Sequence, residues 1–289
     1  MIEYLGYRLA GAVCGLLPEP LMRRVGIALG SLAFMRADRR KLMAMRHLTR
    51  ALGSESEVEE AARQAFAAYG RYWAEVFWVR PRRVPAMLGR ISVEGLDRVK
   101  QAQAAGRGMV LVLPHIGNWE AAGSVAHDLG LELIAVAEDL PNPRLARWFA
   151  GVRKTLGIDV VFADGSPRVM AALAEGLRRG AAIALLTDRN VRVGGSEVEF
   201  FGERTELPAG AALLAARFHV PVLPVAAFFA DGPGHHVVIE APVEIPTEGA
   251  DRVAVGTQRI ASALEGLIRR DPTQWHILQP NWPSDGAAP

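Results

Sequence analysis

The sequence predicts an α/β fold, with a mostly parallel central sheet, helices on both faces of the sheet and a helical layer at the N-terminus. Two observations indicate this fold. From about residue 86 onward, short continuous apolar runs alternate with stretches of helical periodicity, as in parallel strands joined by helices. Before that residue the periodicity is helical only, and no repeat or low-complexity linker divides the chain. We therefore expect one domain over residues 1–289, with a helical annex (1–85) and an α/β core (86–289).

Composition and charge narrow the class of protein. The 289 residues exceed the roughly 100–200 that are usual for one domain, but they suit one large α/β unit, and half of them are hydrophobic. A net charge of +2 is too small to indicate nucleic-acid binding. Cys14 is the only cysteine, which excludes disulfides within the chain and fits a reducing compartment. We find no secretory signal, because no basic region opens the chain and no small-residue cleavage site follows Leu17.

The first 50 residues are typical of a protein that lies on a membrane surface. The apolar segments "MIEYLGYRLAGAVCGLLPEP" and "MRRVGIALGSLAFM" contain arginine or proline and fall short of the ~20 apolar residues that span a bilayer. A basic segment, "RADRRKLMAMRHLTR" (36–50), follows them. Cationic residues beside interfacial helices attract anionic lipid headgroups. The alternative is an ordinary helix that is packed on the core and has a solvated basic face.

The clearest helix is predicted over residues 56–79. Apolar residues recur there with the spacing of one buried helix face. They are Val58, Ala62, Ala65, Phe66, Tyr69, Trp73 and Val76. Ser56 is the expected N-cap, with Glu59 completing a capping box. The sequence "RPRRVP" then ends the helix.

Strands of the core are expected at six places, with helices between several of them. The strand ranges are 108–115, 131–139, 157–164, 181–190, 219–229 and 235–245. Because the carboxyl ends of parallel strands share one edge, ligands bind in a crevice there. The first four strands end in polar residues, namely His115, Glu138 with Asp139, Asp164, and Asp188 with Arg189 and Asn190. We therefore expect these groups to meet at one mouth of the sheet.

His115 and Glu120 lie on either side of the predicted start of a helix at about 118–130. Asn118 can cap this helix, which leaves Glu120 in its first turn. From there the carboxylate can accept the Nδ1–H of His115 and leave Nε2 as a free base. Such a pair, without a nucleophilic Ser or Cys, suits the removal of a proton from a hydroxyl that attacks an acyl carbon. The alternative is a solvated Glu120 and a His115 bonded to a loop carbonyl.

Other classes of protein are weighed against this interpretation. An α/β hydrolase would need a G-x-S-x-G elbow, which the chain lacks. A metal-dependent hydrolase would need clustered His and Asp ligands, and activity that survives EDTA would exclude it. A non-catalytic lipid-binding protein could have the same fold with an apolar cavity that holds lipid.

Glu197 and Glu199 are predicted to share one strand face. Trp275 and Trp282 are predicted to be core or interface anchors.

Four blocks of the sequence resemble one family. "LPHIGNWEAAG" is similar to the H-x4-D/E motif of glycerolipid and lysophospholipid acyltransferases, and closest to the branch of lipid A and phosphatidylinositol mannoside acyltransferases. "MRHLTRALG" with "ARQAFAAYGRYWAEVF" resembles the N-terminal helices of the family, and "LLTDRNVRVGGSEVEFFGERTELPAGAALLAARFHVPVLPV" its central block. "DPTQWHILQPNW" is particularly similar to the mannoside-acylating branch. The resemblance runs nearly end to end.

The resemblance implies transfer of an acyl group from acyl-coenzyme A to a hydroxyl of a glycolipid, without a metal or cofactor. A phosphatidylinositol mannoside is the expected acceptor, with a lipid A precursor as the alternative. The catalytic residues that it implies are His115 as general base, Glu120 as the partner of His115, and Asp188 as a second carboxylate near the imidazole. The expected substrate-binding residues are Asn118, Glu138, Arg153, Arg189, Phe201 and Gly202.

Some of these expectations have alternatives, and some positions depart from the family pattern. Phe201 and Gly202 either line an acyl tunnel or form a buried strand end with a turn. Backbone N–H groups near residues 117 and 118 are the candidate oxyanion donors. Glu120 stands where many relatives have Asp, and His47 where Asn is usual. The expected location is the cytoplasmic face of the cell membrane, with peripheral attachment to an anionic surface and no nucleic-acid partner.

Overall fold

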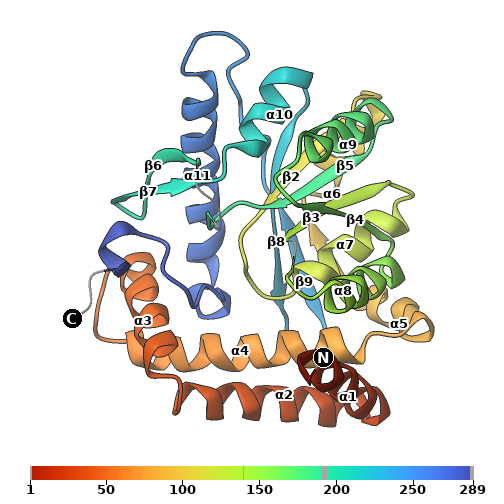
Figure 1. Cartoon of the computed structure of the whole chain (residues 1–289), viewed down its shortest axis with the longest axis vertical. Coiled ribbons are helices and arrows are strands. Elements are labelled where there is room, and N and C mark those ends of the chain that lie inside the picture. The colour runs from red at the N-terminus through yellow and green to blue at the C-terminus, as the bar shows by residue number, and fades with distance from the viewer. Residues whose placement is uncertain (1, 139, 191–193, 287–289) are drawn as a thin grey trace.

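The computed structural model describes residues 2–138, 140–190 and 194–286 (Figure 1). It confirms the α/β fold class. Among these residues, one sheet of seven strands has the order β1-β9-β8-β2-β5-β3-β4. Its strands are β1 (Ile91–Glu94), β2 (Met109–Leu113), β3 (Leu133–Glu138), β4 (Ile158–Ala163), β5 (Ala182–Leu186), β8 (Val222–Phe229) and β9 (His235–Ile239). The strands from β8 to β4 are parallel, whereas β9 runs antiparallel to β8 and parallel to β1.

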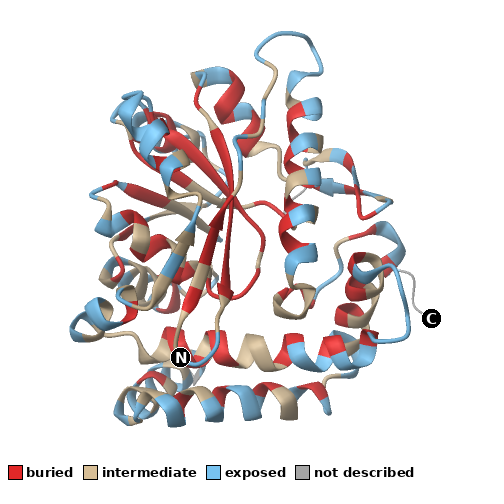
Figure 2. Cartoon of the chain, turned by 180° about the vertical axis from the view of Figure 1, so that it is seen from behind, coloured by how far each residue is buried: buried red, intermediate tan, exposed pale blue. Residues whose placement is uncertain are grey.

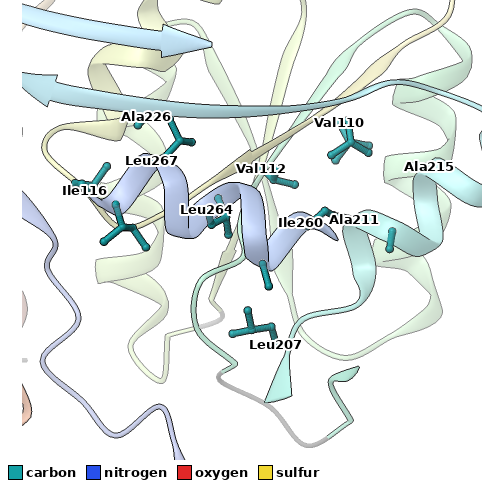
Figure 3. Packing of buried hydrophobic residues seen from close by; sticks show 14 of the residues in the cluster. Val110, Val112, Ile116, Leu207, Ala211, Ala215, Ala226, Ile260, Leu264 and Leu267 are labelled. Carbon is teal, nitrogen blue, oxygen red and sulfur yellow. The ribbon is translucent and has the colours of Figure 1, made fainter. Parts of the chain in front are cut away.

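Helices cover both faces of this sheet, as predicted. One face carries α6 (Leu96–Ala104), α7 (Trp119–Asp128) and α8 (Pro143–Thr155), and the other carries α9 (Pro167–Arg178), α10 (Gly210–Phe218) and α11 (Arg252–Arg270). Because strand side chains alternate between faces, β2 sends Val110 and Val112 towards α10 and α11 and Leu111 towards α7. Figure 3 shows the apolar core between the sheet and helices α10 and α11. Figure 2 shows the central strands as largely buried. Both faces are thus apolar, which explains the continuous apolar runs in the sequence.

The N-terminal helices form a separate layer below the sheet in the view of Figure 1. They are α1 (Ile2–Leu16), α2 (Glu19–Phe34), α3 (Asp38–Leu52), α4 (Val58–Trp78) and the short α5 (Val84–Leu88). The predicted capping box of α4 was wrong, because the N-cap is Glu57 and makes no side-chain cap bond. Ser56 instead bonds to Ser54, and Glu59 pairs with Lys41. Within the described residues, no helix has both the length and the apolarity needed to cross a bilayer.

Glycines bring α2 and α4 into backbone contact. A Cβ added to Gly30 would lie 2.1 Å from the carbonyl oxygen of Phe66, and one added to Gly70 would lie 2.1 Å from that of Gly26. Real Cβ atoms do not approach backbone so closely, so only glycine fits at these crossing points. The two helices therefore pack side by side along their length, as Figure 1 shows.

The C-terminal segment (residues 271–286) returns across the sheet edge and is held by α3. His47 of α3 contacts Asp285 Oδ2 through Nε2 at 2.9 Å and the Ile277 carbonyl through Nδ1 at 3.0 Å. Arg50 donates to Asp285 Oδ1 at 3.0 Å and to Glu203 at 2.7 Å. Burial alone would raise the pKa of Asp285, but the bonds from His47 and neighbouring backbone N–H groups hold it well below its usual range. This ion-pair network fixes the C-terminal segment at the edge of the sheet where the parallel strands end.

A small hairpin lies beside the C-terminal segment. Its strands are β6 (Ser196–Phe200) and β7 (Glu203–Leu207), which pair antiparallel. Phe201 and Gly202 form the two-residue turn, with φ of +52° and +77°, as hairpins of this length require. Glu197 and Glu199 are both exposed on β6, which confirms that they share one face.

Candidate active site

The site is built where two neighbouring strands end. β2 and β5 are adjacent in the sheet, and their register pairs Leu113 with Leu186. Two residues beyond these positions, His115 and Asp188 come face to face. Nδ1 of His115 lies 2.7 Å from Oδ1 of Asp188, and the backbone N–H of His115 donates to Oδ2 at 2.8 Å. The sheet therefore joins two residues that are separated in sequence by two further strands.

Asp188 is fully buried, and its surroundings keep it ionised. The indole N–H of Trp275 donates to Oδ2 at 2.8 Å, and the side-chain amide of Asn281 donates to the backbone carbonyl of Asp188 at 2.9 Å. Burial alone would raise the pKa of Asp188. The nearby His115 ring, its hydrogen bond and the Trp275 indole outweigh that effect and hold the pKa below its ordinary value. The C-terminal segment thus supplies one contact to this carboxylate, from Trp275, and one to the backbone of Asp188, from Asn281.

These contacts determine which nitrogen of His115 carries the proton. A carboxylate only accepts hydrogen bonds, so Nδ1 is the donor and Nε2 keeps its lone pair. The His115 side chain is 26 % exposed, and Nε2 has no hydrogen-bond partner in the part of the chain that the structure describes. The ring of Trp119 packs edge-on at 5.4 Å from the imidazole. His115 is therefore held with one nitrogen free to accept a proton.

Glu120 does not orient His115, and this expectation was wrong. Its carboxylate is buried and accepts from Arg153 of α8, at 2.9 Å from Nη2 and 3.0 Å from Nε. The hydroxyl of Tyr72 donates to the same carboxylate at 3.4 Å. The negative charge of Glu120 raises the pKa of Arg153 above its ordinary value. A planar guanidinium offers two parallel bonds where an imidazole offers one, so Glu120 pairs with α8 rather than with the loop before α7.

Asn118 is buried and engaged at both ends of its amide. Its Oδ1 accepts the backbone N–H of Ala121, so it caps α7 as predicted, and its Nδ2 donates to Glu75 of α4 at 2.7 Å. Glu75 also accepts from Arg71 and from His235, both at 2.8 Å. These contacts link the start of α7 to the N-terminal layer, and they give no support to the prediction that Asn118 binds substrate.

The expected oxyanion donors are engaged within the protein as well. The backbone N–H of Gly117 donates to the carbonyl of Gln274 at 2.9 Å, and that of Asn118 donates to Ala227 at 2.8 Å. A donor that is bonded to a carbonyl cannot stabilise a developing oxyanion. The assignment of residues 117 and 118 as oxyanion donors was therefore wrong.

His115 lines a cleft of about 540 Å³ at the carboxyl-terminal edge of the parallel strands. Glu138, Arg153 and Arg189 line the same cleft, as their predicted role in substrate binding requires. Arg189 also donates to Gln279 at 3.0 Å, and Arg153 is held by its ion pair. Among the described residues, no three His, Cys, Asp or Glu side chains gather as the ligands of a metal ion would.

Other predicted positions lie away from the cleft. Phe201 and Gly202 occupy the hairpin turn, where the Phe201 ring packs 5.6 Å from that of Trp275 and is nearly buried. The alternative interpretation, a buried strand end with a turn, is thus the observed one. Asp164 is exposed and does not line the cleft, and Asp139 lies outside the described residues.

An apolar cavity, the α7 slot, adjoins the cleft. It lies between α7 and the sheet, and Trp119 and Leu186 line both the slot and the cleft. Small residues face the strands from α7, namely Ala122, Gly123 and Ala126. Strand residues complete the lining, including Leu111, Leu113, Leu133, Ala184, Val225, Val237 and Ile239. The slot therefore begins beside His115 and continues into the apolar core.

Trp275 is the contact that the sequence reasoning missed. It is 2 % exposed, which confirms the predicted core position, but its indole also bonds to Asp188. The neighbouring His276 donates its backbone N–H to the carbonyl of His115 at 2.8 Å, and its Nε2 contacts the carbonyl of Gly117. Burial lowers the pKa of His276 to about 4, so this ring is neutral at physiological pH. The signal for this contact was the block "DPTQWHILQPNW", which contains Trp275 and which we interpreted only as a resemblance to the family.

Comparisons with known proteins show which family the chain resembles. A family model described as "Bacterial lipid A biosynthesis acyltransferase" matches residues 2–284. A protein of Mycolicibacterium smegmatis named "Phosphatidylinositol mannoside acyltransferase" is 37 % identical over 250 residues, which cover 83 % of this chain and 79 % of the relative. A protein of the same name from Mycobacterium tuberculosis is 36 % identical over 222 residues, which cover 75 % of this chain and 69 % of the relative.

Proposed function

The chain belongs to the bacterial lipid A biosynthesis acyltransferase family and is an O-acyltransferase, and we propose that it moves a fatty acyl group from acyl-coenzyme A to a hydroxyl of a phosphatidylinositol mannoside. The pair of His115 and Asp188 carries this proposal. A buried, ionised carboxylate fixes the proton on Nδ1, and Nε2 faces no competing partner among the described residues. The names of the relatives favour the mannoside acceptor over a lipid A precursor.

In the proposed reaction His115 acts as a general base. Nε2 takes the proton of the acceptor hydroxyl as its oxygen attacks the thioester carbonyl carbon. Asp188 stabilises the imidazolium that forms. When the tetrahedral intermediate collapses, the bond from carbon to sulfur breaks and His115 returns the proton to the leaving thiolate. The products are an ester and free coenzyme A, so the imidazole ends the cycle neutral.

The α7 slot is the proposed place for part of the donor chain, because its volume of about 70 Å³ is too small for a whole long acyl chain. Its lining is apolar apart from Glu120 and Arg153, which neutralise each other in their ion pair. A chain inside the slot would place its carbonyl beside Trp119 and His115, where the slot meets the cleft. Burial of the chain would contribute about 0.8 kcal/mol per methylene group. Glu138 and Arg189, at the polar side of the cleft, would then contact the acceptor headgroup.

Attachment to a membrane surface is part of the proposal. Apolar side chains of α1 and α2 are exposed, with Leu9 at 66 %, Leu16 at 86 % and Leu29 at 60 %. Three arginines of the basic segment are exposed, namely Arg36 between α2 and α3, and Arg39 and Arg40 in the first turn of α3. Arg46, Arg50 and Lys41 instead bond to other parts of the protein. The docking surface is therefore α1, α2 and the first half of the basic segment, and we place it on the cytoplasmic leaflet.

One assay tests the reaction and its acceptor together. The purified chain is incubated with a radiolabelled long-chain acyl-coenzyme A and vesicles that contain either a phosphatidylinositol mannoside or a lipid A precursor. We expect a labelled ester only with the mannoside, and none with the His115→Ala variant. A product with the lipid A precursor alone would replace the acceptor, and retention of label without product from either lipid would contradict the proposed reaction.

A further inference from the structure

A second apolar cavity, the α1 groove, lies on the N-terminal layer. It has a volume of about 540 Å³ and lies between α1, α4 and α8. Its lining is Gly6, Tyr7 and Ala10 of α1, Trp73 and Phe77 of α4 and Leu145 of α8, with Glu3 also on α1. The ring of Tyr7 lies 5.9 Å from that of Trp73 and 5.7 Å from that of Phe77. The groove therefore has an aromatic wall and, unlike the α7 slot, lies among surface helices.

This wall continues into the cleft that contains His115. Trp73 lines both the α1 groove and the cleft. Phe149, which also lines the cleft, packs 5.8 Å from Trp73 and 5.6 Å from Tyr7. The α7 slot adjoins the same cleft through other residues, Trp119 among them. The cleft thus adjoins two apolar cavities, one in the core and one on the N-terminal layer.

The α1 groove also borders the exposed apolar side chains of α1. Leu5 and Leu9 are 57 % and 66 % exposed, and they alternate along the helix with the groove residues Gly6 and Ala10. A Cβ on Gly6 would meet no described atom within 4 Å, so the space above this residue is open. Hydrocarbon that reaches α1 from a lipid surface therefore meets the groove before it meets the cleft.

We propose that the α1 groove binds a hydrocarbon tail of the acceptor lipid while the donor acyl chain lies in the cleft and reaches into the α7 slot. The inference rests on the proposed function, because acyl transfer between two lipids must accommodate two separate hydrocarbon parts. The donor carbonyl has to reach His115, and the slot inside the core takes only part of the donor chain, because its volume is about 70 Å³. The acceptor tails are attached behind the headgroup and stay on the side of the bilayer, where α1 lies.

Photolabelling tests where the tail binds, without any need for catalysis. A phosphatidylinositol mannoside with a diazirine in one acyl chain is presented in neutral phospholipid vesicles, irradiated with the full chain, and the labelled peptides are mapped. We expect label on the groove residues Tyr7, Trp73 and Leu145. Label confined to the outer side chains of α1, or label in the α7 slot, would overturn the assignment.

A groove-filling variant tests the consequence for transfer. Gly6→Trp places a large side chain in the open space, and Gly266→Trp is the control, because Gly266 is also a helical glycine with no described atom within 4 Å of its Cβ. With the diacyl acceptor we expect Gly6→Trp to lower kcat/KM about 10-fold or more, as expected if roughly two methylene groups lose their apolar site. With the deacylated, water-soluble headgroup the change stays below about 2-fold. Gly266→Trp changes neither value.

The two readouts separate the groove from the reaction. An equal loss with both acceptors, or no loss with the diacyl acceptor, overturns the groove assignment. Groove labelling by a wild-type chain that transfers no acyl group overturns the proposed function and supports the groove as a lipid site. Transfer without groove labelling supports the reaction and overturns the groove assignment.

Discussion

At the scale of single residues, the proposed reaction depends on one imidazole whose two nitrogens have different tasks. Nδ1 is bonded to Asp188, and the proposal assigns Nε2 to the substrate. We therefore predict that His115→Ala lowers the rate of acyl transfer by about 10²–10⁴-fold, the range for loss of a general base. Its thermal stability should stay near that of the wild type, because Asp188 keeps its bonds to Trp275 and to the backbone of residue 115. Unimpaired turnover in a radiolabel assay would contradict the mechanism.

The carboxylate partner gives a second prediction. Asp188→Asn preserves shape but presents an amide to Nδ1, which favours the wrong tautomer of His115. We expect the transfer rate to fall at least about 100-fold. The matched control is Glu120→Gln, because Glu120 bonds to Arg153 and not to the imidazole. A larger loss of kcat in Glu120→Gln than in Asp188→Asn would reverse our assignment of the two carboxylates.

The lowered pKa of Glu75 leads us to predict that the stability of the fold depends on pH. Burial alone would raise its pKa, but the bonds and charges of His235 and Arg71 lower it from 4.5 to about 2. A lowered pKa stabilises the fold above pH 4.5, and this stabilisation is lost as the pH falls from 4.5 towards 2. It corresponds to about 3 kcal/mol. Glu75→Gln should therefore be less stable by about that amount at neutral pH, and the difference should shrink on acidification.

Urea unfolding of both proteins between pH 7 and pH 3 measures this difference. Other carboxyl groups titrate in both proteins, so their contributions cancel. Two unfolding free energies that fall in parallel with pH would show that Glu75 does not retain its charge in the folded state.

Local spacing indicated the wrong carboxylate as the partner of His115, and the reason is physical, whereas the position of Asp188 near the imidazole, expected only from the family resemblance, is confirmed. Glu120 is five residues from His115, so local spacing favoured it. Asp188 becomes the neighbour of His115 only because β5 pairs with β2, a pairing between strands that are far apart in sequence. Trp275 adds a contact from still further along the chain. Glu138, Arg153 and Arg189 were placed correctly in the cleft, because strand ends and the family resemblance both indicate that edge.

At the scale of elements, the contact between α2 and α4 is sensitive to substitution at its glycines. A Cβ on Gly70 would lie 2.1 Å from a backbone oxygen of Gly26, and backbone cannot move aside as a side chain can. We predict that Gly70→Ala lowers the free energy of unfolding by roughly 1–3 kcal/mol. Gly151→Ala is the control, because Gly151 of α8 has no described atom within 4 Å of its Cβ. It should raise stability by about 0.5–1 kcal/mol. If urea unfolding gave the same change in the free energy of unfolding for Gly70→Ala and Gly151→Ala, the close contact between α2 and α4 would not contribute to stability.

Elements with strong periodicity were predicted well, and those fixed by tertiary contacts were not. The helix over 56–79 is α4 (Val58–Trp78), and the six expected strands all occur, each within the range predicted for it. β1 and α6 were not predicted. β1 has an alternating burial pattern over only four residues, because it is an edge strand, and its pairing with β9 defines it. The predicted cap of α4 does not form, because Glu59 bonds to Lys41 of α3 instead. This is a tertiary contact, which the local sequence does not indicate.

At the scale of the whole molecule, the proposed docking surface makes a prediction about membranes. Leu9→Ser with Leu16→Ser removes two exposed apolar side chains of α1, which contribute up to about 1.5–3 kcal/mol each when fully buried in lipid. We expect at least about 10-fold weaker binding to anionic vesicles in a sedimentation assay. Stability and transfer to a water-soluble acceptor should not change. The control pair is Leu213→Ser with Val255→Ser, which are exposed on α10 and α11. Equal losses in both pairs would place the membrane contact elsewhere.

The attachment of Asp188 to Trp275 and Asn281 has a consequence for how the protein is made. A ribosome produces α1 and α2 first, and these helices can meet a bilayer while the remainder of the polypeptide is still being translated. Asp188 acquires the indole partner of its carboxylate and the amide partner of its backbone carbonyl only after translation has passed residue 281. With the proposed docking by α1 and α2, a nascent chain would be at the membrane before it is able to turn over substrate, so localisation would precede activity in the life of each molecule.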